Sequence, residues 1–197
     1  MAETDCLLTL TLLGSRLSLV SLELSSFPGL TDAGVAAICS SPGGTPASLR
    51  TLVLTGSHIT DKSLVSISRH LLHLEELHLE RTRVSDEGVA ALSALNNLWS
   101  LSLAETNITG KALQALASLG VVRTLKVLNL SRTALTDDDI PCLASFRSLE
   151  TLGLDITNVT EAAIAGIKEK LPGLATVRLA KPVPLRARHD NNMDIDV

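Results

Sequence analysis

Two glutamates and a histidine alternate along one short segment of the chain, as Glu76, His78 and Glu80 in the stretch LEELHLE. Alternate side chains of a strand point to the same face, so these three groups would lie side by side. Such a set could transfer protons or bind a metal ion, could contact another protein, or could form a charged strip that meets only water. The corresponding positions of the neighbouring segments supply no further strong ligand, since they hold Thr51, Val53, Thr55, Ser100, Ser102 and Ala104. A metal ion would lack its usual third and fourth ligands, so catalysis is the least favoured interpretation.

The other reactive side chains form no recognisable site. Cys6, Cys39 and Cys142 have no neighbouring base, and His70 and His73 stand without cysteine partners. The sequence also contains no nucleophile motif and no glycine-rich phosphate loop. We therefore predict no catalytic residue, no cofactor and no metal site, and a protein that is not an enzyme. The alternative is an enzyme that uses the strip around His78.

The composition limits the classes of partner and the cellular compartment. The chain has 197 residues, 45% of them hydrophobic but only 2% aromatic, so a core would be aliphatic. A net charge of −4 provides no basic face for nucleic acid. The odd number of cysteines favours a reducing compartment, and Glu3 and Asp5 stand where a secretory signal needs positive charge. No apolar run reaches the roughly 18 residues of a membrane span. We expect a protein of the cytoplasm, or of the nucleus, that does not insert into membranes.

The segment around His78 recurs along the chain, and this recurrence predicts the architecture. A unit of the form Leu-x-x-Leu-x-Leu, with one Val substitution, begins at intervals of 24 to 30 residues, at Leu19, Leu49, Leu74, Leu98, Leu125, Leu149 and Leu174. Five consecutive units continue with a hydroxyl residue, an aliphatic residue and a helix opening, as in ITD, VSD, ITG, LTD and VTE. Apolar residues then repeat every three or four positions. Each unit thus predicts a strand followed by a helix.

This pattern resembles the leucine-rich repeat family, in particular the helix-containing repeats of ribonuclease-inhibitor-like proteins and F-box receptors. The first full unit, LVSLELSSFPGLTDAGVAAI, is most similar to the cysteine-containing subclass, although Phe27 stands where that subclass usually has cysteine. No F-box-like segment precedes Leu19. The resemblance implies a protein–protein interaction module, such as an adaptor or the substrate-recognition subunit of a ubiquitin ligase.

The expected fold is an α/β leucine-rich repeat solenoid, an open arc with a parallel sheet on its concave side and helices on its convex side. One strand and one helix cannot bury their apolar faces alone, so each repeat covers the next. Leu101 and Leu103 represent the two strand positions that should face the core. We expect an irregular apolar segment or remnant repeat at residues 1–18, about seven repeats at 19–183, and a polar disordered tail at 184–197.

Hydroxyl residues should cap the helices, often followed by an acid that suits the helix dipole. The predicted caps are Thr31, Thr60, Ser85, Thr109, Thr136 and Thr160. Pro141 would remove a helix hydrogen bond, so the helix after Thr136 should begin nearer Asp138 or Asp139.

Another protein should bind on the concave face, with charge centred on the third repeat. Outward strand positions contribute Glu76, His78, Glu80, Asn129 and Asp155. The next position outward adds Arg81, Glu105 and Arg132. Trp99, the single tryptophan, precedes a strand in a column of mixed residues, and tryptophan is a frequent hot-spot residue.

Overall fold

A single parallel sheet of seven strands forms one layer of the molecule. The computed structural model describes residues 18–27, 29–40 and 45–181. The strands are hydrogen-bonded in sequence order: β1 (Ser21–Glu23), β2 (Thr51–Val53), β3 (Glu76–His78), β4 (Ser100–Ser102), β5 (Val127–Asn129), β6 (Thr151–Gly153) and β7 (Thr176–Arg178). Equivalent repeat positions pair directly, so that Leu77 lies beside Leu101 and Leu101 beside Leu128.

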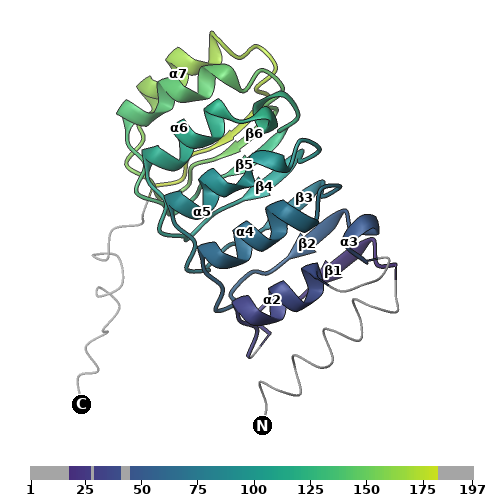
Figure 1. The fold of residues 1–197 in the computed structure, drawn as a ribbon. Coiled ribbons are helices and arrows are strands. Elements are labelled where there is room, and N and C mark those ends of the chain that lie inside the picture. The colour runs from purple at the N-terminus through teal and green to yellow at the C-terminus, as the bar shows by residue number, and fades with distance from the viewer. Residues whose placement is uncertain (1–17, 28, 41–44, 182–197) are drawn as a thin grey trace, which may run out of the picture.

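The helices cover one face of this sheet and leave the other face open (Figure 1). They are α2 (Asp32–Cys39), α3 (Thr45–Ser48), α4 (Asp61–His70), α5 (Asp86–Ala90) with the 3-10 helix η1 (Ala91–Ala94), α6 (Gly110–Ser118), the 3-10 helices η2 (Gly120–Arg123) and η3 (Asp137–Ser145), and α7 (Glu161–Lys168). The predicted solenoid, with an open parallel sheet opposite its helices, is therefore confirmed. No helix in the described part of the chain is long and apolar enough to cross a membrane.

Leucine columns fill the space between the two layers. Leu101 and Leu103 are both fully buried, as are their counterparts in the neighbouring repeats, so the predicted strand register is correct. Leu22 and Val177 are only partly buried, and they lie on β1 and β7, the two edge strands of the described sheet. Phe146 is the one aromatic residue among the fully buried side chains. The core is thus almost wholly aliphatic, as the composition predicts.

The acids that follow the caps connect successive repeats. Asp86 accepts hydrogen bonds from the backbone N–H and the hydroxyl of Thr109, each at 2.7 Å, and from the backbone N–H of Ala112 at 3.2 Å. The equivalent pairs are Asp32 with Thr60, Asp61 with Ser85, and Asp137 with Thr160. We call these four carboxylates the aspartate ladder. All six predicted residues occupy the N-cap positions, but the side chains of Thr31 and Ser85 accept no capping hydrogen bond. Four of the six residues bind the carboxylate of the preceding repeat.

Burial alone would raise the pKa of Asp32, the first carboxyl group of the ladder. The hydrogen bonds from Ser63 and Thr60 outweigh burial and lower this pKa below its usual value. Asp32 therefore acts as a charged acceptor at neutral pH.

The ladder is interrupted between the fourth and fifth repeats. Gly110 stands where other repeats have an acid, and Asp139 fills the space that a side chain at Gly110 would take. Asp139 instead caps its own helix by accepting from the N–H and hydroxyl of Thr136 at 2.9 and 3.1 Å. Backbone bonds join other repeats at this edge, from Arg83 to Ile59, Asn107 to Val84 and Asn158 to Leu135. Among the described residues, no equivalent bond joins the fourth repeat to the fifth.

The segment after Thr136 departs from the sequence-based expectation. Its helix begins at Asp137, not at Asp138 or Asp139, and it is a 3-10 helix with Pro141 inside it. A 3-10 helix uses i to i+3 hydrogen bonds in short tight turns, so it accommodates a proline that would break the continuous bonding of an α-helix. The boundaries predicted at 1–18 and 184–197 fall almost entirely outside the described residues and remain predictions.

Candidate functional site

Glu76, His78 and Glu80 do share the open face of the sheet. The imidazole Nε2 of His78 lies 3.7 Å from a carboxylate oxygen of Glu76, and its Nδ1 lies 3.5 Å from Glu80. Thr55 donates a hydrogen bond to Glu80 at 2.6 Å, and Thr51 makes a longer contact of 3.5 Å with Glu76. The three charged side chains retain between 23% and 32% of their exposure. They therefore form a preorganised but accessible strip on β3.

The electrostatics of the strip stabilise the charged form of Glu80. Burial opposes ionisation of Glu80, but hydrogen bonds from His78 and Thr55 and the proximity of Ser102 outweigh it, and the pKa is lowered to about 2. The hydrogen bond with Glu80 is the main cause of a raised pKa at His78, where Glu76 adds to the effect and burial opposes it. Protonated His78 would leave the strip with one net negative charge, and neutral His78 with two.

A groove runs from this strip across the open face. It has a volume of about 350 Å³ and is lined by His78, Glu80, Ser100, Leu101, Ser102, Val127, Leu128, Asn129, Thr151, Gly153, Thr176 and Arg178. At β4 the groove floor is formed by Ser100 and Ser102, whose small side chains are almost fully buried. We call this feature the concave groove, with β3 as its acidic wall.

The far side of the concave groove is formed by β5, β6 and β7. Asn129 Oδ1 accepts hydrogen bonds from the backbone N–H and the hydroxyl of Ser131 at 3.2 and 2.8 Å. A side chain at Gly153 would run into Asn129, so glycine keeps this part of the groove open. Asp155 accepts from the N–H of Ala180 at 2.7 Å and lies 3.6 Å from Nε of Arg178. The cation at this end is therefore already paired.

Arg81, Glu105 and Arg132 lie outside the groove, in the turns that follow β3, β4 and β5. All three are exposed and have a left-handed backbone, with φ of 55°, 57° and 58°. Nε of Arg132 lies 3.8 Å from Glu105. These residues form a rim beside the groove, so a partner bound in the groove would contact them only if it also extended over this rim.

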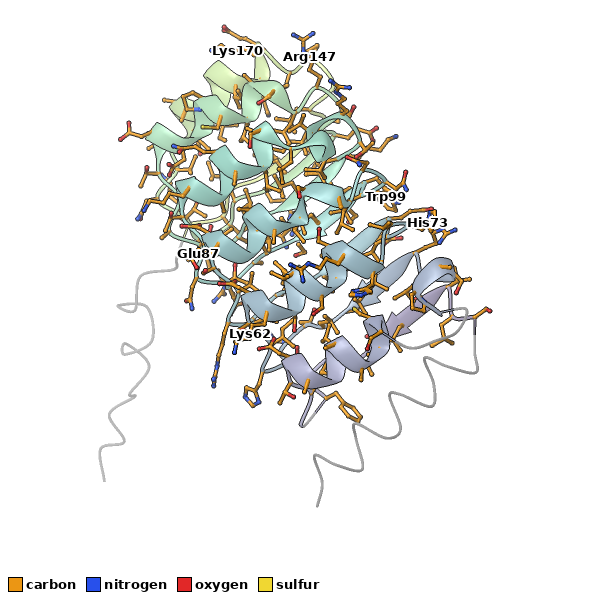
Figure 2. The ribbon with its side chains drawn as sticks, viewed as in Figure 1. Lys62, His73, Glu87, Trp99, Arg147 and Lys170 are labelled. Atoms are coloured by element: carbon orange, nitrogen blue, oxygen red, sulfur yellow. The ribbon has the colours of Figure 1, made fainter. Side chains whose placement is uncertain are left out.

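Trp99 does not belong to the concave groove. It precedes β4 at the opposite edge, where it is half-buried and lines a separate hollow with Asn97, Arg123, Thr124, Lys126, Ser148 and Glu150. In Figure 2, Trp99 and His73 are labelled at one edge of the molecule, and Glu87 is labelled at the opposite edge. The sequence analysis grouped Trp99 with the concave residues, but the structure places it just before β4, in a hollow separate from the concave groove. Its role as a partner contact stays a prediction.

The chemistry available in the groove is hydrogen bonding and charge complementarity. No group of three histidine, cysteine, aspartate or glutamate side chains in the described ranges could hold a metal ion. Burial raises the pKa of the Cys39 thiol to about 12, which keeps it protonated and unreactive. The groove is open to solvent along the sheet, a geometry suited to an extended surface of another molecule.

Of the residues that line the groove, only His78, Glu80 and Asn129 were predicted as site residues, and three of the others have a clear role. Ser102 forms the floor beside Glu80, Val127 supplies an apolar wall, and Arg178 closes the far end. The repeat register predicts the strand positions of these residues. The only feature of the sequence that indicates a groove is the small size of the side chains on β4. The aspartate ladder had a stronger signal, since an acid follows the cap in most repeats.

Comparison with known proteins supports the repeats and the fold. Residues 45–68, 70–93 and 123–144 match the leucine-rich repeat family model. A search of curated proteins found no match. Among 126 matching solved chains is an internalin, InlF, from Listeria monocytogenes, with a TM-score of 0.57 and 18% identity. Internalin C2 from the same species has a TM-score of 0.56 and 22% identity, and a leucine-rich repeat protein from Leptospira interrogans has 0.51 and 23%.

Coverage limits what these matches show. They cover 90%, 84% and 80% of this chain, but 55%, 75% and 36% of the respective matched chains. At these identities the likeness is one of fold. It does not distinguish the ribonuclease-inhibitor-like or F-box-receptor subtype from other leucine-rich repeats.

Proposed function

Because the chain is built from leucine-rich repeats, we propose that it is a non-catalytic protein-interaction module that binds its partner through the concave groove. The observation that carries this proposal is the open groove, whose wall is formed by His78 and Glu80. These two residues belong to a preorganised acidic strip that Glu76 extends along β3. Fixed side chains lose little conformational freedom on binding, and fixed charges select a complementary surface.

The partner that suits this wall is a protein with a basic segment. Glu80 stays charged at neutral pH because its pKa is lowered, and the one arginine in the groove is paired with Asp155. An acidic wall would repel the phosphates of a nucleic acid. We therefore propose a protein partner and not a nucleic acid.

More specific roles rest on the sequence pattern. We propose an adaptor or a substrate-recognition subunit, and the version related to ubiquitin-ligase receptors is supported only by the resemblance of the repeats. A location in the cytoplasm, or in the nucleus, is supported by the unpaired thiols of Cys39 and Cys142.

The test is affinity purification from cell extract with two charge-reversed proteins. Glu76→Lys with Glu80→Lys reverses the acidic wall, whereas Glu87→Lys with Glu161→Lys makes the same charge change at exposed positions on helices. Only the first pair should lose the partner, and the interaction should then be confirmed with purified components. Thermal melts accompany each variant, since loss of the Glu80 hydrogen bonds should lower stability by about 1–2 kcal/mol.

The proposal fails if the groove variant is folded and retains every partner that the unaltered protein captures. It also fails if the helix variant loses the same partners to the same extent, because the loss would then reflect net charge and not the groove.

A further inference from the structure

The concave groove contains a buried hydroxyl group without a hydrogen bond. Ser102 is 4% exposed, and its Oγ forms no hydrogen bond of normal geometry with any described residue. It lies close enough to Glu80 to contribute to the lowered pKa of that carboxylate. A buried polar group without a partner is unfavourable in the free protein, so a ligand that supplies the partner gains affinity.

The charges next to Ser102 favour a cationic ligand. Glu80 accepts from Thr55 through one oxygen and faces His78 through the other, and each carboxylate oxygen can accept two hydrogen bonds. His78 is shared between two carboxylates at 3.5 and 3.7 Å, so it does not neutralise them both. Acceptor capacity therefore remains beside the unbonded hydroxyl.

The shape next to the floor fits one long side chain. From β3 to β5 the groove spans two strand spacings, about 10 Å, and its volume of about 350 Å³ is at the small end of ligand pockets. Half-buried Val127 offers an apolar surface on the same face as Ser102. Such a surface would cover the methylene stem of a basic side chain while the charged head stays among acceptors.

We propose that the concave groove is a receptor site for an arginine side chain of the partner protein. The guanidinium donates to Glu80 and to Ser102 Oγ, and the stem lies along Val127. The inference rests on the proposed function, since the arginine belongs to a bound protein. Arginine is favoured over lysine because the acceptors lie at several points of the groove, and a planar group with five N–H donors meets them together.

A small probe tests this site without knowledge of the partner. Backbone amide signals of the isotope-labelled protein are followed by NMR during titration with N-acetyl-argininamide. The comparison probes are the lysine analogue and the uncharged citrulline analogue. We expect saturable shifts at Glu80, Ser102 and Asn129 with the arginine probe, at least severalfold weaker binding of the lysine probe, and none of the citrulline probe.

Variants assign the contacts. Glu80→Gln should weaken arginine binding roughly tenfold, the effect of losing one charge-assisted hydrogen bond. Ser102→Ala should weaken it severalfold while the protein stays folded, because only an unbonded hydroxyl is removed. The matched controls are Glu87→Gln, an exposed acid, and Ser68→Ala, a buried serine on α4. Both should bind the probe as the unaltered protein does.

The outcomes separate this inference from the proposed function. Absence of saturable shifts, equal binding of the lysine or citrulline probe, or unchanged binding by both groove variants would overturn the arginine site. Partner capture that still depends on Glu76 and Glu80 would in that case leave the proposed function standing. Conversely, arginine binding that Glu80→Gln abolishes, with partner capture insensitive to the groove, would support the site and reject the proposed function.

Discussion

Replacement of Asp86 by alanine should weaken the contact between the third and fourth repeats. The substitution removes three hydrogen bonds to the carboxyl group of Asp86, two from Thr109 and one from the N–H of Ala112. It leaves the backbone N–H groups at the start of α6 without their carboxylate partner. Because repeat stability is close to a sum of neighbour contacts, the damage should spread to both sides of the joint.

The size of the effect follows from these three bonds. Hydrogen bonds to charged groups contribute roughly 1.5–3 kcal/mol each when buried, and about 1 kcal/mol each at a partly exposed site such as this one. We expect Asp86→Ala to lower the free energy of unfolding by about 2–4 kcal/mol. For a chain of this length that corresponds to a fall in Tm of roughly 5–15 °C.

The chain contains a matched control at the same position of a different repeat. Glu161 also opens a helix, but α7 belongs to the sixth repeat, and Glu161 is exposed and forms no hydrogen bond to a following repeat among the described residues. Glu161→Ala removes only the favourable interaction with the helix dipole, about 0.3–1 kcal/mol. Thermal and urea melts of both variants provide the comparison. Equal destabilisation by the two substitutions would show that the ladder adds nothing beyond the dipole.

Three further substitutions have distinct expected results. Leu101→Asp places a charge in the fully buried core, so it should cost more than about 4 kcal/mol and abolish the cooperative melt; a near-normal melt would contradict the register. Ile156 has a left-handed backbone with φ of 56°, so Ile156→Asn should raise stability by about 1 kcal/mol in urea titrations, and a loss would show that its packing matters more than the strain. Glu80→Gln should change the pH dependence of stability. The lowered pKa of Glu80 stabilises the fold above pH 4.5, and this contribution is lost as the pH falls towards about 2. The raised pKa of His78 stabilises the fold below pH 6.5, and that contribution is lost as the pH rises through the raised value. The free energy of unfolding, measured from pH 2 to 8, should therefore depend less on pH in the variant, both at the acid end and near neutral pH. The difference at the acid end should be about 1–2 kcal/mol. An unaltered pH dependence in the variant would exclude the coupling between Glu80 and His78.

The repeat architecture was predictable because its cause is local and periodic. A leucine such as Leu77 has the same surroundings in every repeat, so spacing alone determines strand position, register and the face that is buried. The helix after Thr136 was mispredicted because its geometry depends on Asp139, whose orientation follows from the absence of a side chain at Gly110 in another repeat. A rule based on Pro141 alone cannot include that contact.

The site was only partly predictable, because grooves arise from differences between repeats. The alternation rule correctly placed Glu76, His78 and Glu80 on one face. It could not show that Ser102 would be buried beside Glu80 without a hydrogen bond, since this depends on side-chain orientations on two strands. The rule also does not apply to Trp99, which lies outside the strands.

The gap in the aspartate ladder at Gly110 has a mechanical consequence. The joint between the fourth and fifth repeats lacks both the carboxylate link and the backbone bond that hold other joints at that edge. We expect bending of the array to concentrate there, since fewer bonds resist it. The acidic wall on β3 lies on one side of this joint and Asn129 on β5 lies on the other. A small rotation at this joint would then change the distance across the groove between the acidic strip and Asn129. The width of the groove at Ser102 would change with it.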